Sequence, residues 1–247
     1  MPRKDGRTAT ALRPVKLEAG FIKHHAGSVL VSFGDTRVLC VATAEERVPP
    51  HRMASGGGWV TAEYSMLPAA THDRKQREIS RGKADARSIE IQRLIGRALR
   101  NVVDMDLIGQ RQINVDCDVL QADGGTRTAS ITGGYVALAL CIQDLQKRGL
   151  PMKAKKPSDA LKAQIAAVSL GILNGEVWTD LNYGEDSRAE TDLNLVARSD
   201  GTIVEIQGTA EGEPMRRDQL VAIVDQGLVA IGELCAKQRE VLGGILG

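Results

Sequence analysis

Aromatic residues are scarce in this chain, since Phe, Trp and Tyr make up only 3% of its 247 residues. The 43% of hydrophobic residues is still enough for a sizeable core, built mainly from aliphatic side chains. A chain of this length forms one large domain or two small ones. An excess of one charge is also missing, because 32 Lys and Arg are matched by 31 Asp and Glu. Any contact with nucleic acid must therefore come from a local basic patch.

Metal-binding and disulfide patterns are missing as well. The four cysteines are far apart in apolar stretches, which predicts buried free thiols in a reducing compartment. They are Cys40, Cys117, Cys141 and Cys235. The four histidines show no zinc-binding spacing. Neither the nucleophile elbow G-x-S-x-G nor the dinucleotide fingerprint G-x-G-x-x-G occurs, which argues against serine-hydrolase and nicotinamide chemistry.

Long hydrophobic runs are absent too. No apolar run approaches the length of a membrane span, and the N-terminus lacks the apolar core of a signal peptide. We therefore expect a soluble, cytoplasmic protein with no membrane contact.

Groups of strands followed by helices occur twice along the chain, which is typical of an α+β fold. Short turns at Gly34-Asp35 and Asn174-Gly175 mark the hairpins. A basic, proline-containing connector at Pro151–Ser158 separates two halves, about 1–150 and 159–247, which we expect to share one core within a single domain 1–247. Predicted strands are Ser28–Phe33, Thr36–Ala42, Gly58–Leu67, residues 111–120, Gln164–Leu173, Glu176–Asn182, Thr191–Ala197 and Thr202–Gln207, and predicted helices run from Ala84 to Val103, from near Arg127 to Arg148 and after Pro214.

The run Asp123-Gly124-Gly125-Thr126-Arg127-Thr128 stands between a predicted strand and a predicted helix. Its glycines allow a tight turn and a close approach to a ligand, and the first helical turn offers unpaired N–H groups. Threonine hydroxyls and the planar Arg127 side chain suit a phosphate. It is not a Walker A loop, since no Lys-Ser/Thr pair follows the glycines. An ordinary strand–turn–helix corner capped by threonine is the alternative.

Two acidic residues follow the Asn174-Gly175 hairpin. Asp180 lies near the end of a predicted strand and Asp186 lies six residues later, beyond a turn at Gly184. Together they can hold Mg²⁺ with substrate phosphates, or one of them can act as a general acid. A solvated acidic loop is the alternative. Asp192 either joins this cluster or lies on the outer face of its strand.

The segment 74–87 is the densest basic patch of the chain, with six Lys and Arg against two acidic residues. Such patches bind phosphate backbones, and the absence of aromatic residues here excludes base stacking. A solvated charged loop is the alternative. Arg87 starts the following helix, from where it can reach the same anion as Arg127.

These motifs together resemble the ribonuclease PH family of phosphate-dependent 3′-to-5′ exoribonucleases, which includes polynucleotide phosphorylase and exosome ring subunits. The resemblance extends essentially end to end. Its motifs are Arg3–Arg7, Gly34–Thr36, Gly58–Tyr64, Arg81–Arg87, Asp118–Thr128 and Asp180–Asp186. It implies the ribonuclease PH fold, with duplicated β-α halves as layered sheets and helices, and a ring-shaped homo-hexamer built as a trimer of dimers.

The resemblance also implies residue roles. Phosphate binding falls to Gly125, Thr126 and Arg127, with Arg87 as the second arginine. Asp180 and Asp186 match the family's carboxylates near the scissile phosphate, as catalytic residues and as ligands of Mg²⁺. The RNA-binding residues implied are Arg74, Arg77 and Arg81.

The implied reaction trims the 3′ ends of tRNA precursors and other RNA. Inorganic phosphate, as co-substrate, releases nucleoside diphosphates, and the reverse reaction adds nucleotides. A non-catalytic RNA-binding ring subunit is the main alternative, although the chain retains both arginines and both aspartates. A phosphorylase of free nucleosides is a third, and the basic loop argues against it.

Overall fold

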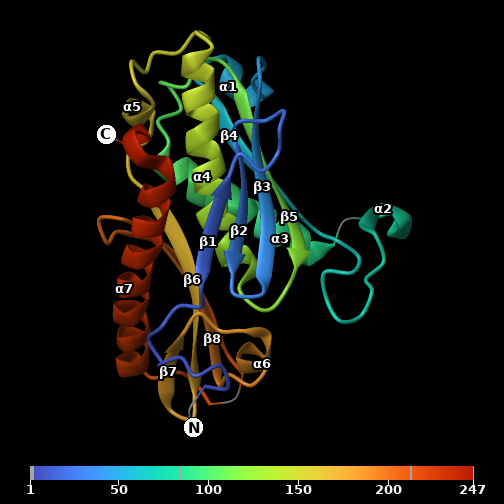
Figure 1. Ribbon diagram of the computed structural model, residues 1–247, viewed down its shortest axis with the longest axis vertical. Helices are drawn as coiled ribbons and strands as arrows, with labels where there is room; N and C mark the ends of the chain where they lie inside the picture. The colour runs from blue at the N-terminus through green and yellow to red at the C-terminus, as the bar shows by residue number, and fades with distance from the viewer. Residues whose placement is uncertain (1–2, 84, 212, 247) are drawn as a thin grey trace.

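The structure is a computed structural model that describes residues 3–83, 85–211 and 213–246. It is elongated, with one β-sheet in each half of its length and long helices beside them (Figure 1). The main hydrophobic cluster, which includes Val31 and Leu195, contains residues from both halves of the chain. The α+β fold predicted from the sequence is confirmed.

The first sheet has five strands in the order β1-β2-β3-β5-β4. All its neighbours are antiparallel except β4 and β5, which are parallel. The predicted hairpin at Gly34 is present, whereas β1 was not predicted, although Val15, Leu17 and Ala19 alternate with Lys16 and Glu18. Its strands are β1 (Val15–Ala19), β2 (Ser28–Phe33), β3 (Thr36–Glu45), β4 (Trp59–Met66) and β5 (Gln112–Gln121).

The second sheet has four antiparallel strands in the order β7-β6-β8-β9. Every residue of β6 is buried, because other elements cover both of its faces. The strand predicted over Glu176–Asn182 ends early, since Asp180 adopts a positive φ of 54° that an extended strand cannot accommodate. The strands are β6 (Ile165–Leu173), β7 (Glu176–Thr179), β8 (Thr191–Arg198) and β9 (Ile203–Ala210).

Helix α4 is the central element of the molecule. It contacts β2, β3 and β5 of the first sheet and β6 of the second (Figure 1). The sequence predicts one apolar stripe on this helix, but nearly all sides are buried because the sheets cover opposite faces. The helices are α1 (Pro50–Met53), α2 (Glu78–Arg81), α3 (Ala86–Val102), α4 (Thr126–Lys147), α5 (Pro157–Ala160), α6 (Tyr183–Asp186), α7 (Arg217–Leu242) and the 3₁₀ turn η1 (Gly243–Ile245).

The sequence analysis expected no apolar run long enough to span a membrane, and the C-terminal helix is an exception to this expectation. Within the described ranges, Arg217–Ile245 meets that criterion by length and composition alone, with a mean hydropathy of 1.5. In the structure α7 packs along β6, β7 and β1, with Ile223, Ile231 and Leu234 buried (Figure 1). A helix that covers a core meets the same criterion.

All four cysteines are buried free thiols, as predicted. Burial raises the pKa of Cys141 to about 12 and that of Cys235 to about 11. These thiols are therefore protonated near neutral pH and poor nucleophiles.

Two adjacent glycines of α4 allow a matched test of its packing. A Cβ on Gly133 would lie 2.7 Å from Val31 Cγ1, whereas one on Gly134 would lie 3.4 Å from its nearest neighbour, Val115 Cγ1. We predict that Gly133→Ala lowers the free energy of unfolding by about 1–3 kcal/mol through overpacking. Gly134→Ala should be neutral or raise it by up to about 1 kcal/mol through helix propensity. Denaturant unfolding measures both, and equal losses would show that α4 does not press on β2 as described.

Candidate functional site

The glycine-rich loop between β5 and α4 has a conformation that only glycine accommodates. Gly124 and Gly125 have φ angles of 76° and 66°, and a Cβ on Gly124 would lie 2.6 Å from the carbonyl oxygen of Leu181. The N-cap of α4 is Gly125, which has no capping side chain. The alternative of a corner capped by threonine is therefore wrong. Thr126 instead hydrogen-bonds the Tyr64 hydroxyl at 2.8 Å.

The carbonyl groups of this loop face the protein interior. Arg13 Nη1 donates to the Asp123 carbonyl at 2.6 Å, and Thr36 Oγ1 donates to the Gly124 carbonyl at 2.6 Å. In the described part of the chain no protein group accepts from the amides of Gly124 or Gly125. Successive backbone N–H groups in a turn can form a concave donor site for anions. The loop is therefore built to offer backbone donors to a ligand.

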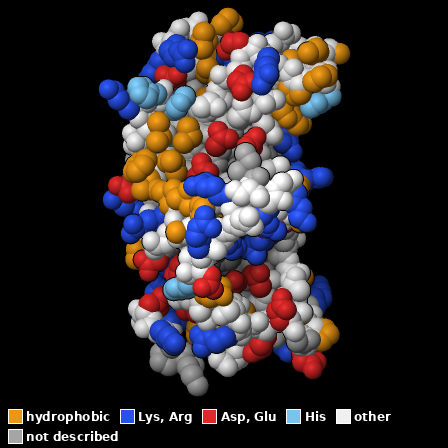
Figure 2. Space-filling model, turned by 90° about the vertical axis from the view of Figure 1, so that its right-hand side faces the viewer, with side chains coloured by type: hydrophobic (Ala, Val, Ile, Leu, Met, Phe, Trp, Pro, Cys, Tyr) orange, Lys and Arg blue, Asp and Glu red, His pale blue; other side chains and the backbone are white. Residues whose placement is uncertain are grey.

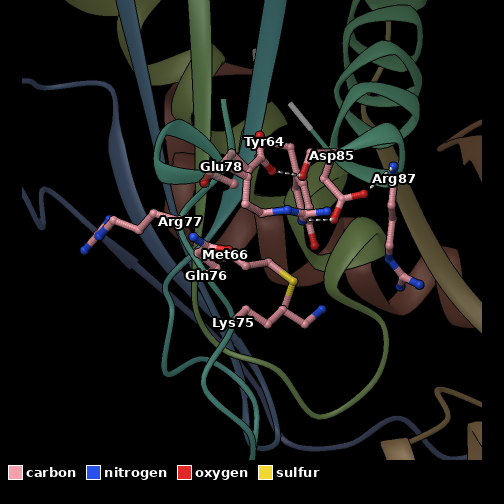
Figure 3. Close-up of a pocket in the computed structure, with 11 residues that line it drawn as sticks. Tyr64, Met66, Lys75, Gln76, Arg77, Glu78, Asp85 and Arg87 are labelled. Carbon is pink, nitrogen blue, oxygen red and sulfur yellow. Dashed lines mark hydrogen bonds and ion pairs between the residues drawn. The ribbon is translucent and has the colours of Figure 1, made fainter. Parts of the chain in front are cut away.

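A cavity of about 400 Å³ opens in front of this loop. Gly124, Gly125 and Thr126 line it, and Arg87 and Asp186 join them from α3 and α6. A second cavity of about 510 Å³ shares Met66, Lys75 and Arg87 with the first (Figure 3). The two adjoin between the glycine-rich loop and the basic loop.

Arg87 lies where the sequence places the second arginine. It stands in the first turn of α3, where the Asp85 carboxylate accepts from its backbone N–H at 3.1 Å (Figure 3). Its side chain lines both cavities. Burial raises the pKa of Tyr64, Asp186 and Asp192, and the charge of Arg87 opposes that rise in each, which places Arg87 within electrostatic reach of all three.

Arg127 is anchored beside the cavity. Its Nη1 donates to Gln207 Oε1 at 2.8 Å and to Glu90 Oε1 at 3.2 Å. No partner for its Nε or Nη2 occurs among the residues that the structure describes. A pair of guanidinium nitrogens of this kind can bind two oxygens of one anion. Sequence reasoning missed Glu90 and Gln207, because their proximity to Arg127 depends on the packing of α3 and β9.

Asp186 and Asp180 occupy different environments. Asp186 lines the cavity, where burial raises its pKa against the opposing effect of Arg87, Arg127 and Arg13. Asp180 is fully buried, and Arg13 binds both of its oxygens: Nη2 to Oδ1 at 2.7 Å and Nε to Oδ2 at 3.1 Å. The lining of the cavity includes Asp186 but not Asp180. The Mg²⁺ that the sequence analysis expected the two carboxylates to share stays a prediction.

Of the two carboxylates expected to hold Mg²⁺, Asp186 lines the cavity, and the Asp73 carboxylate lines it as well. No group of three or more His, Cys, Asp or Glu side chains gathers as a metal site within residues 3–83, 85–211 and 213–246. Mg²⁺ commonly takes one or two carboxylates and completes its shell with substrate phosphates and water. Asp186 suits that arrangement because it lines the cavity, whereas Asp180 is fully buried with both oxygens bonded to Arg13.

Asp192 belongs to the same electrostatic cluster. It lies on β8, and burial together with repulsion from Asp186 raises its pKa to about 6, although Arg127 and Arg87 oppose the shift. The sequence left its place open because β8 is buried on both faces and shows no clean alternation.

The basic loop, which is the part of segment 74–87 that precedes α3, projects from the body of the molecule and contains α2 (Figure 1). Arg74 lines the cavity in front of the glycine-rich loop, whereas Arg77 and Arg81 line the adjoining one. Arg81 pairs with Asp85 at 3.6 Å, and Arg77 points away from the other lining residues (Figure 3). Lys and Arg side chains gather across the middle of the face from which this loop projects (Figure 2).

Comparison with known families fits this geometry. The profile of the 3′ exoribonuclease family, domain 1, matches residues 11–142, and that of domain 2 matches residues 163–230. The chain belongs to the 3′ exoribonuclease family. This confirms membership of the ribonuclease PH and exosome-ring family that the motifs indicated.

Solved structures share the fold at low sequence identity. Rrp46 from rice (Oryza sativa) is 19% identical with a TM-score of 0.76, and the alignment covers 97% of this chain and 100% of that one. An Archaeoglobus fulgidus exosome with RNA bound to the active site is 22% identical with a TM-score of 0.78, over 96% and 92% of the chains. An archaeal exosome core is 21% identical with a TM-score of 0.74, over 96% and 91%.

The raised pKa of Asp192 predicts a pH-dependent stability difference. The folded-state pKa of about 6 exceeds the unfolded value of 3.8, so the stabilising contribution of the protonated group is complete below pH 3.8 and lost as the pH rises through 6. The unfolding free energy of Asp192→Asn minus that of the native chain should therefore be about 1–2 kcal/mol larger at pH 8 than at pH 4.

Asp200→Asn is the matched control. Asp200 is exposed, and hydrogen bonds from Thr202 lower its pKa, so its replacement should bring no gain at pH 8. Denaturant unfolding at both pH values measures the two differences. A constant difference between Asp192→Asn and the native chain would contradict the cluster.

Proposed function

We propose that this protein is a phosphate-dependent 3′-to-5′ exoribonuclease that releases nucleoside diphosphates from RNA. The observation that carries the proposal is the cavity in which free amides of Gly124 and Gly125 face Arg87 and Asp186. Membership of the 3′ exoribonuclease family supplies the reaction class. The cavity adds a place for phosphate beside a carboxylate.

The reaction joins two anions, so its barrier is largely electrostatic and positional. The amides of Gly124 and Gly125, the start of α4, Arg87 and Arg127 bind and orient the attacking phosphate. A phosphate oxygen attacks the terminal phosphorus, and the bond from that phosphorus to the 3′ oxygen of the preceding nucleotide breaks. The 3′ oxygen then takes up a proton. Strong donors fixed around the phosphate lower the cost of bringing the anions together.

Asp186 is the carboxylate that acts at the reacting atoms. Its raised pKa suits donation of a proton to the leaving 3′ oxygen. In the alternative role, the ionised Asp186 would hold a Mg²⁺ together with substrate phosphates, and that ion would stabilise charge on the transferred phosphoryl group. Asp180 acts through Arg13 instead, because its oxygens are bound away from the cavity.

A structured RNA such as a tRNA precursor is the substrate that the surface favours. The projecting basic loop bears exposed arginines and offers phosphate contacts without aromatic stacking. We further propose assembly as a cytoplasmic homo-hexamer, a trimer of dimers. Two similar structures are exosome cores, and the edge strand β9 exposes Ile203 and Ile206, each 41% accessible.

Product analysis tests the proposed activity. A tRNA with a 3′ extension is incubated with and without inorganic phosphate, and the released nucleotides are separated. We predict nucleoside diphosphates only when phosphate is present. Asp186→Asn should still bind the RNA, because losing a negative charge does not weaken attraction to a polyanion, yet turn over at least about 100-fold more slowly.

Two outcomes would contradict this function. Monophosphates released equally without phosphate would indicate hydrolysis. RNA binding without product from the native protein would favour the alternative, a non-catalytic RNA-binding ring subunit.

The basic loop gives a separate prediction on substrate choice. Replacing Arg77 and Arg81, which line only the adjoining cavity, together by Gln should weaken tRNA binding and flatten the slope of log affinity against log salt by about 0.7–0.9 for each lost phosphate contact. Phosphorolysis of a short oligonucleotide should persist, since Arg87 and Arg127 remain. A salt titration beside an oligonucleotide assay measures both. An unchanged slope with collapsed oligonucleotide turnover would mean that the loop builds the active site.

A further inference from the structure

Arg13 hydrogen-bonds both Asp180 and the backbone of the glycine-rich loop, and no role has yet been given to it. It is 5% exposed and bonds both oxygens of Asp180 through Nε, Nη2 and its own backbone N–H. The remaining nitrogen, Nη1, donates to the Asp123 carbonyl at 2.6 Å, and Nη2 also reaches the Gly124 carbonyl at 3.4 Å. One guanidinium therefore joins Asp180 to two successive peptide groups of the loop.

The direction of these bonds fixes the direction of the loop amides. In a planar trans peptide the C=O and N–H groups point to opposite sides. The Asp123 carbonyl shares its peptide group with the Gly124 amide, and the Gly124 carbonyl shares its own with the Gly125 amide. Because Arg13 draws both carbonyls inward, both amides face the cavity.

Thr36 adds a second tie on the Gly124 carbonyl and also holds the peptide group that precedes Asp123. Its hydroxyl donates to the Gly124 carbonyl at 2.6 Å and accepts from the Asp123 amide at 2.9 Å. The side chain is fully buried at the start of β3. The loop is thus held from the N-terminal segment through Arg13 and from the first sheet through Thr36.

We propose that Arg13 and Thr36 are positioning residues for the phosphate, and that Asp180 acts by orienting Arg13. The inference rests on the proposed phosphorolytic function and deepens it. Neither residue touches substrate. Each sets the direction of the Gly124 and Gly125 amides, which are the groups that bind the attacking phosphate. Arginine is required at position 13 because its planar fork serves Asp180 and the loop carbonyls at once, which a lysine ammonium cannot do.

Kinetics with phosphate as the varied substrate test this role. Arg13→Lys keeps the charge beside Asp180 but loses the bond to the Asp123 carbonyl. We expect the KM for phosphate to rise about 10-fold or more, with the KM for RNA and the kcat at saturating phosphate changed less than about threefold. The stabilisation of the protein against heat by added inorganic phosphate should weaken in parallel, which gives a readout besides activity.

Thr36 provides the variants that keep the proposal testable if Arg13→Lys fails to fold. Thr36→Val removes the hydroxyl and preserves the shape, whereas Thr36→Ser keeps the hydroxyl. We expect a several-fold rise in the KM for phosphate in Thr36→Val and a near-native value in Thr36→Ser. Equal KM values in both would overturn the positioning role of the hydroxyl.

The outcomes separate this inference from the proposed function. If the native protein releases diphosphates with phosphate, yet Arg13→Lys and Thr36→Val are folded and keep the native KM for phosphate, only the positioning inference is wrong. A loss confined to the KM for RNA would also overturn it. If the native protein neither binds phosphate nor uses it, the proposed function is wrong, and this inference with it.

Discussion

The buried ion pair between Arg13 and Asp180 is the interaction on which the site depends. Asp180 is fully buried and Arg13 is only 5% exposed, so each would be strongly destabilising without the other. The pair is compensated by a dense set of bonds, because Arg13 also serves the carbonyls of Asp123 and Gly124. A second buried pair, Arg3 with Glu185 at 2.6 Å, ties the same N-terminal segment to α6. Together they fasten the start of the chain across the second sheet and hold α6, which carries Asp186, against the glycine-rich loop.

This arrangement explains why two acidic residues only six positions apart have different roles. Asp180 ends β7 with a positive φ and turns inward to Arg13. Asp186 emerges on α6 into the cavity, facing Arg87. The inner carboxylate is bonded to Arg13 and the outer one lines the cavity, which are the positions that the proposed roles require. The cavity can therefore concentrate positive donors around a phosphate while keeping a carboxylate of raised pKa beside it.

Local sequence patterns predicted much of this structure, and long-range packing explains what they missed. The helical spacing of Ile91, Leu94 and Ile95 defined α3, and the paired glycines marked the turn before α4, because both signals lie within a few residues. The pairing of Asp180 with Arg13 could not be read in this way, since the partners are 167 positions apart. The contacts of Arg127 with Glu90 and Gln207 depend in the same way on how α3 and β9 pack. The spacing of Asp180 and Asp186 suggested a shared metal ion. The positive φ of Asp180, with its side chain bonded to Arg13, cannot be recognised from the residue types alone.

The most direct measurement of the central claim is a crystal structure of the native protein with bound inorganic phosphate, collected in low-chloride, sulfate-free solution. The account predicts a phosphate within about 2.7–3.2 Å of the Gly124 and Gly125 amides. Arg87 should contact it, and Arg13 should remain on Asp180 and on the loop carbonyls. A phosphate bound elsewhere in the cavity, or loop amides turned away from it while Arg13 keeps its present contacts, would contradict the claim.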